Sequence, residues 1–109
     1  MKKIILLMLT AFIVLSVSAQ SAQEMNKKEQ HIVSIASLTG KGDLVKLKPA
    51  LNEGLNAGMT VNEIKEVLVH SYAYCGFPRA LRGLQTFVAV LNERKTQGIT
   101  DNRGREALP

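Results

Sequence analysis

Several kinds of chemistry are excluded by what this sequence lacks. It has one cysteine, Cys75, in 109 residues, so the chain can form neither an internal disulfide nor a CxxC redox pair. Its two histidines, His31 and His70, belong to no HxxxH or HxxE cluster, so we expect no metal site. No segment long enough to form a strand alternates between apolar and polar residues. The sequence therefore predicts an all-α protein, and we expect it to work without a cofactor.

The sequence also has no strong excess of charge of one sign. Lysine and arginine number 14 and aspartate and glutamate 9, which gives a net charge of +5. The basic residues occur in pairs such as Lys27-Lys28 and Arg94-Lys95, and these pairs are spread along the chain. Charges distributed in this way are typical of a solvated surface, and we expect no nucleic-acid partner.

A single long apolar run lies at the N-terminus. Lys2 and Lys3 precede the apolar residues 4–17, and small residues suited to a cleavage site follow at 17–19 (VSA). This layout predicts a signal peptide over residues 1–19. The alternative is a membrane anchor, but the run would form a helix of about 21 Å, shorter than a hydrocarbon core of about 30 Å. We therefore expect an exported protein, periplasmic or secreted, without membrane contact after cleavage.

The rest of the chain divides into a leader over residues 20–28, a folded domain over residues 29–95 and a tail over residues 96–109. Apolar residues that recur at the spacing i, i+3, i+4 and i+7 predict four helices in the domain. Their expected ranges are 29–38, 44–56, 60–75 and 77–95.

Individual residues predict where these helices begin and end. Gly40 is placed to end the first helix, and Asp43 can cap the second. Pro49 lies inside the second pattern, so this helix either starts just before the proline or bends there. Thr60 and Glu63 have the spacing of a capping box, in which each side chain binds the main-chain amide of the other residue.

The apolar stripes of the third and fourth helices are expected to face the core, with Gly83 allowing close approach of a neighbouring helix. The stripes consist of Ile64, Val67, Leu68, Ser71 and Cys75 on the third helix, and of Leu81, Leu84, Phe87, Val88 and Leu91 on the fourth. A domain of this size buries only about 60% of its unfolded surface. We therefore expect a homo-oligomer in which apolar helix faces meet.

Glu66, His70 and Tyr74 follow one another at intervals of four residues. At 100° per residue this spacing places them in one ridge along the third helix, beside its apolar stripe. A carboxylate one turn from an imidazole can orient it and raise its basicity, which suits a general acid or base. The alternative is an ordinary surface pair, which stabilises a helix by a few tenths of a kcal/mol.

Cys75 lies at the end of the same helix, just before Gly76. A helix C-terminus does not lower the pKa of a thiol as an N-terminus would. One interpretation is therefore that Cys75 is a small apolar residue buried in the core. Oxidation to a sulfenic acid by a peroxide is the other.

Five segments of the sequence resemble the carboxymuconolactone decarboxylase family. They are residues 38–42 (LTGKG), 47–51 (LKPAL), 55–60 (LNAGMT), 63–70 (EIKEVLVH) and 74–80 (YCGFPRA), within a resemblance that covers about residues 29–95. The resemblance implies the alkylhydroperoxidase D-like fold, assembled into trimers or hexamers. It also implies one of two activities, cofactor-free decarboxylation of a carboxylated lactone or hydroperoxide reduction by a CxxC pair.

Three functions follow from these observations. The first is an exported decarboxylase-like lyase on a small carboxylated or lactone-type molecule, with His70 as general acid or base, Glu66 as its orienting partner, and Tyr74 and Arg79 in contact with the substrate. The second is a peroxidase-like antioxidant protein that uses Cys75 and an external thiol. The third is a non-enzymatic oligomer that binds a small molecule on the same fold.

Overall fold

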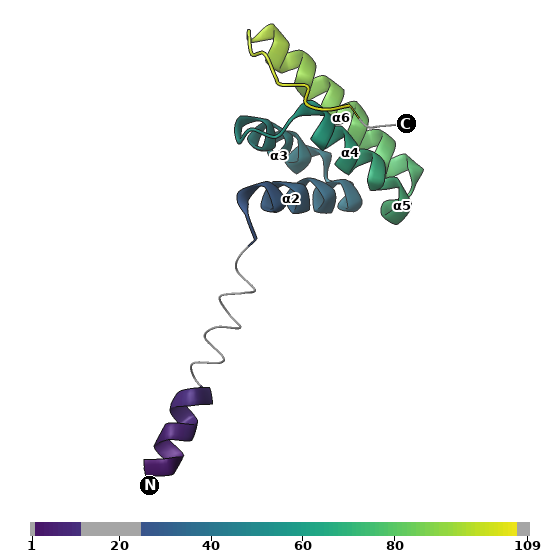
Figure 1. Cartoon of the computed structure of the whole chain (residues 1–109). Helices are drawn as coiled ribbons and strands as arrows, with labels where there is room; N and C mark the ends of the chain where they lie inside the picture. The colour runs from purple at the N-terminus through teal and green to yellow at the C-terminus, as the bar shows by residue number, and fades with distance from the viewer. Residues whose placement is uncertain (1, 12–24, 107–109) are drawn as a thin grey trace.

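The computed structural model describes residues 2–11 and 25–106, and within these residues every regular element is a helix. Residues 2–11 are helical, and the domain contains α2 (Lys27–Lys41), α3 (Leu44–Asn56), α4 (Val61–His70), α5 (Tyr72–Cys75) and α6 (Phe77–Thr96) (Figure 1). The predicted all-α class is therefore confirmed. The proposed cleavage site at 17–19 and most of the leader lie outside the described residues.

The helices pack around one apolar core. α2 packs against α3, α4 and α6, and α6 also packs against α3, α4 and α5 (Figure 1). Apolar side chains from four helices and from the turn before α4 fill the space between them: Ile35, Leu47, Leu51, Leu55, Met59, Ile64, Leu68, Phe87 and Val90. None of the helices in the part of the chain that is described is long and apolar enough to cross a bilayer.

The first helix ends later than Gly40, the residue expected to end it. α2 continues to Lys41, and Gly42 forms the C-cap with a positive φ of 73°. The amide of Gly42 donates to the carbonyls of Leu38 and Thr39. Only glycine adopts this left-handed conformation at low cost, and the sequence offered two glycines for the position. The helix uses the second one.

The second helix begins at Leu44, so of the two alternatives for Pro49 the one in which the helix starts just before the proline is wrong. The Asp43 side chain accepts a hydrogen bond from the Lys46 amide and caps the helix. Pro49 lies inside α3 and has no amide with which to bind the Val45 carbonyl. Val45 is strongly exposed, so water can satisfy that carbonyl. The proline is tolerated because it lies near the solvated start of the helix.

The third predicted helix is divided into α4 and α5 by Ser71. The Ser71 hydroxyl donates to the Val67 carbonyl at 2.8 Å, one turn back. Such a bond from a serine to its own helix competes with the regular backbone pattern and bends helices. Tyr74 therefore lies on a separate helical turn from His70, although both were expected on one continuous ridge.

The buried face of the fourth helix differs from the predicted one. Phe87 is buried and Leu84 and Leu91 are half-buried, but Leu81 is 40% and Val88 55% exposed. The face that points inward is instead made of Ala80, Gly83, Phe87, Val90 and Arg94. Small residues let α6 approach closely, and a Cβ on Gly83 would lie 3.0 Å from Thr39 and 3.1 Å from Leu68. The close approach predicted at Gly83 is confirmed.

Candidate functional site

The N-terminal end of α4 is held by a capping box and by an ion pair to α2. Thr60 and Glu63 form the predicted capping box, with the Glu63 amide donating to the Thr60 hydroxyl at 3.1 Å. The Glu63 carboxylate also forms an ion pair with Lys28 of α2. The bond to Lys28, which has the largest effect, and the bonds to Thr60 lower the pKa of Glu63 from its ordinary value of 4.5. Glu63 is therefore ionised at neutral pH and fixes the start of α4 against α2.

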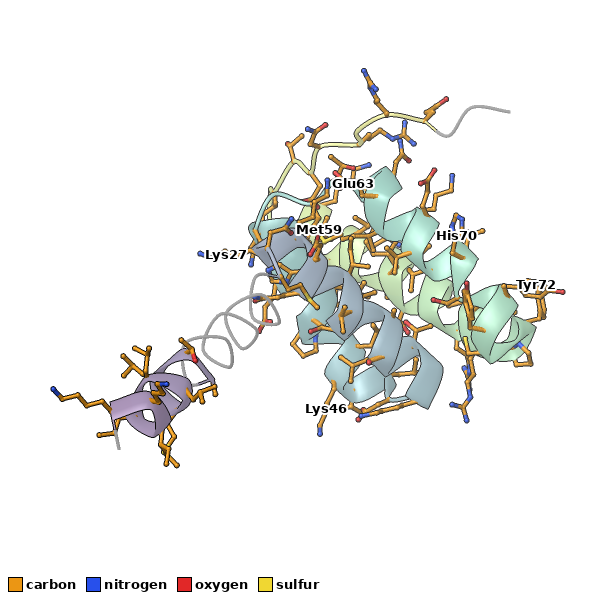
Figure 2. All side chains as sticks on the ribbon, turned by 60° about the horizontal axis from the view of Figure 1, so that its bottom comes forward. Lys27, Lys46, Met59, Glu63, His70 and Tyr72 are labelled. Atoms are coloured by element: carbon orange, nitrogen blue, oxygen red, sulfur yellow. The ribbon has the colours of Figure 1, made fainter. Side chains whose placement is uncertain are left out.

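A groove of about 440 Å³ lies between α2 and α4. Its volume falls in the range of small-molecule sites. The apolar part of its wall comes from both helices, and the polar part comes from one side of α4 and from α5; together they are Ile32, Ala36, Glu63, Glu66, Val67, His70, Ser71 and Tyr74. Figure 2 shows Glu63 and His70 near opposite ends of α4, with Tyr72 beyond them on α5. The groove therefore runs along the helix.

Glu66, His70 and Tyr74 all line this groove. All three side chains are exposed in the single chain, and Tyr74 is 91% exposed. The predicted residues are thus brought to one surface, and that surface is open to solvent. An enclosed site would require a further wall.

Glu66 orients the His70 ring through its main chain. The ring nitrogen Nδ1 lies 2.9 Å from the carbonyl oxygen of Glu66. A carbonyl can only accept, so Nδ1 carries the proton in this bond, and in a neutral ring Nε2 is then the nitrogen that can accept a proton. The Glu66 carboxylate was expected in the orienting role. The carbonyl can take this role because it lies one turn before His70 and its oxygen has a second lone pair with which to accept from the ring.

Arg79 and Cys75 do not line the groove. The Arg79 guanidinium donates to the Gly40 carbonyl, which joins the start of α6 to the end of α2. This contact satisfies a carbonyl in the last turn of α2, where a cation is favoured. The Cys75 thiol is half-buried and donates to the Ser71 carbonyl at 3.0 Å.

Sequence reasoning missed a buried polar cluster around Arg94 that joins α6 to α3 and to Asp101. Arg94 is buried, and its guanidinium binds Asp101, Asn52 and Asn56. One signal was present, because Arg94 continues the period of the inward face formed by Gly83, Phe87 and Val90. A charged residue in that register indicates a buried partner, but its partners lie on α3 and beyond α6, so spacing alone could not identify them.

No set of three metal-binding side chains comes together in residues 2–11 or 25–106. An imidazole with a defined tautomer, carboxylates and a phenol beside an apolar wall instead form the kind of site that proteins use for small organic molecules.

A comparison with models of protein families identifies the family of this chain. The model of the carboxymuconolactone decarboxylase family matches residues 9–89, so the chain belongs to that family. The match begins within the segment expected to be a signal peptide and ends within α6. No curated protein and no solved structure matches the chain significantly. Family membership supports a decarboxylase-like or alkylhydroperoxidase-like function in general terms.

Proposed function

We propose that this protein is a cofactor-free lyase that acts on a small carboxylated or lactone-type molecule, with His70 as its general acid and base. The observation that carries the proposal is the groove in which His70, Glu66 and Tyr74 lie opposite Ile32 and Ala36 of α2. The apolar wall suits a ring or hydrocarbon portion of a substrate. The polar wall provides a proton donor beside it.

The reaction that fits these groups is loss of a carboxylate as carbon dioxide. The bond between the carboxylate carbon and the ring carbon breaks, and its electron pair passes into the conjugated lactone carbonyl as an enolate. Protonated Nε2 of His70 gives its proton to the ring carbon, and solvent returns a proton to Nε2. In this proposal the Tyr74 hydroxyl, which lines the same groove, donates a hydrogen bond to the enolate oxygen. The net change replaces a carboxylate by hydrogen.

The central test compares substitutions of two residues that line the groove and one residue that lies outside it. His70→Ala should lower kcat for carboxymuconolactone by about 10²–10⁴-fold, because it removes the proton donor. Glu66→Gln keeps the main-chain carbonyl that orients the ring, so its loss should stay below about tenfold, short of the loss expected for general acid–base catalysis. His31→Ala is the matched control, since His31 lines a different cavity beside Lys27 and Met59. Steady-state decarboxylation is followed by ultraviolet absorbance.

Two results would contradict parts of this mechanism. Unchanged turnover in the His70→Ala variant would remove His70 from the chemistry. Equal losses in the His70→Ala and Glu66→Gln variants would mean that the Glu66 carboxylate takes part in the reaction. Binding of the lactone by a wild-type protein that does not convert it would favour the non-enzymatic binder.

We also propose that the protein assembles as a homo-oligomer. The support is an exposed apolar stripe on α6, formed by Phe77, Leu81 and Val88, beside the exposed Tyr72. The ring of Tyr72 packs edge-on against Phe77, with 6.2 Å between the ring centroids. Leu81→Lys together with Val88→Lys should shift the native mass toward the monomer in sedimentation, whereas Val45→Lys on α3 should not.

Export is a further part of the proposal. The basic start, the apolar run and the small residues at 17–19 support a cleaved signal peptide. N-terminal sequencing of the protein recovered from its native host should begin at Gln20. A mature chain that begins at Met1 would contradict this part alone.

A further inference from the structure

The segment after α6 is bound to the start of α4 over several residues. We call residues 101–106 the strap. The carbonyl of Asn102 accepts from the Val61 amide at 2.9 Å, and the carbonyl of Arg103 accepts from the Asn62 amide at 3.0 Å. Figure 1 shows this yellow segment running back beside α6 to the start of α4. The strap thus uses amides in the first turn of α4 that have no partner within the helix.

A buried ion pair anchors the beginning of the strap. The Arg94 side chain is 7% exposed and the Asp101 side chain 13% exposed, and Nη2 of Arg94 lies 2.9 Å from the Asp101 carboxylate. The same guanidinium donates to Asn52 at 3.2 Å and to Asn56 at 2.9 Å, both on α3. The first residue of the strap, Asp101, is therefore fixed to α6 and through it to α3.

Gly104 fixes the course of the strap further on. Its φ is 73°, and a Cβ at this position would overlap the side chain of Thr60. Its amide donates to the Asn102 side chain at 3.0 Å, and its carbonyl accepts from the Asn62 side chain at 3.3 Å. A residue with a side chain could not pass this close to the cap of α4.

The end of the strap continues the wall of the groove. A second cavity of about 440 Å³ is lined by Arg105 and Glu106 of the strap and, facing them, by Lys28, Glu63 and Glu66. Glu63 and Glu66 also line the groove that contains His70. The two cavities are thus neighbours along α4, one with a largely apolar wall and the other with charged walls.

We propose that the strap is the far wall of the binding site and positions the polar end of an elongated ligand. This inference rests on the proposed function, and it further specifies that the substrate is elongated. From Glu63 to His70 the helix rises about 10 Å, at 1.5 Å per residue. A ligand that spans both cavities has its lactone or carboxylate end at His70 and a chain of about that length whose polar end lies at the strap.

The test combines two glycine variants with ligands of increasing length. Gly104→Ala should displace the strap from Thr60 without changing a groove residue. Gly98→Ala is the matched control, because Gly98 has a similar φ of 80° and a Cβ added there would meet no atom within 4 Å. The probes are γ-carboxy-γ-butyrolactone and its derivatives with hydroxyl-terminated chains of increasing length. Binding is measured by calorimetry, and docking of the strap by hydrogen exchange at the Val61 and Asn62 amides.

For the wild-type protein and the Gly98→Ala variant, affinity should rise about tenfold as the chain approaches the length of the helix segment, because its terminal hydroxyl then gains a hydrogen bond to a charged side chain at the strap. In the Gly104→Ala variant the two amides should exchange faster and this gain should disappear, while affinity for the shortest lactone should be unchanged. Faster exchange with the gain retained would overturn the role of the strap and leave the proposed function intact. Failure of every probe to bind the wild type would overturn both proposals.

Discussion

The two ends of α4 are built in different ways. At the N-terminal end the Thr60–Glu63 capping box, the ion pair with Lys28 and the strap all act on the same turn. At the C-terminal end Ser71 interrupts the helix, and Tyr74 is almost fully exposed. One end is fixed by its own cap and by bonds to two other parts of the chain, α2 and the strap, and the other is largely open to solvent.

This difference bears directly on the proposed function. The groove runs from the fixed end at Glu63 to the open end at Tyr74, with His70 between them. Bonds at the fixed end keep the Glu63 carboxylate in place against α2. The open end lies beside Tyr72 and Phe77, the exposed aromatic pair of the proposed oligomer interface. We infer that the fold itself completes one end of the site and that a second copy completes the other.

The largest effect is expected from breaking the anchor of the fixed end. Asp101→Ala leaves the buried Arg94 guanidinium without its carboxylate, and removal of one partner of a buried pair costs about 3 kcal/mol or more. The free energy of unfolding measured in urea should fall by about that amount. A change below about 1 kcal/mol would mean that the pair behaves like an exposed one.

The exposed pair Lys48–Glu93 provides the matched control. Its nitrogen–oxygen distance is 2.6 Å, but the two side chains are 45% and 51% exposed. Glu93→Ala should therefore cost less than about 1 kcal/mol, because solvent already screens this pair. The two substitutions together measure how much burial adds to an ion pair in this domain.

A smaller effect should separate the two ends of α4 directly. Thr60→Ala removes the cap of the helix and should destabilise the domain by about 1 kcal/mol. Ser71→Ala removes a hydroxyl that bonds only to its own helix, so the loss should be clearly smaller. Thermal unfolding of both variants under one condition compares the two ends. Equal losses would contradict the distinction between a fixed end and an interrupted one.

The smallest effect is a dependence on pH at the fixed end. The Lys28 ion pair and the Thr60 bonds lower the pKa of Glu63 below 4.5 in the folded protein. The ionised carboxylate therefore stabilises the fold above pH 4.5, and this contribution is lost as the pH falls through the lowered pKa. Glu63→Gln removes the titrating group. The difference in unfolding free energy between wild type and variant should shrink as the pH falls from about 7 to about 3.

Local signals in the sequence were reliable where one residue decides the outcome. The capping box at Thr60 and the cap at Asp43 form as predicted, because each bond lies within four residues. The end of α2 was misjudged, since Gly40 and Gly42 both suit a helix end and local propensity does not separate them. The contact of Arg79 with the Gly40 carbonyl joins residues far apart in the sequence, and nothing local indicates it.

The candidate site was predicted in part for the same reason. Glu66 and His70 are one turn apart, so helical geometry alone places them on one side of α4. The opposite wall, with Ile32 and Ala36, depends on how α2 packs against α4. The role of the Glu66 carbonyl was not predicted, because the carbonyl and the carboxylate of Glu66 both lie one turn before His70 and spacing does not choose between them.

The sequence by itself determined the helical class, the caps of α3 and α4, the family resemblance and the common side of Glu66 and His70. These features depend on intervals of a few residues, over which helical geometry is fixed. Tertiary structure alone decided the inward face of α6, the burial of Arg94 and the course of the strap along α4. Each of these depends on which distant side chains meet, and a pattern along one helix specifies a face without specifying its partner.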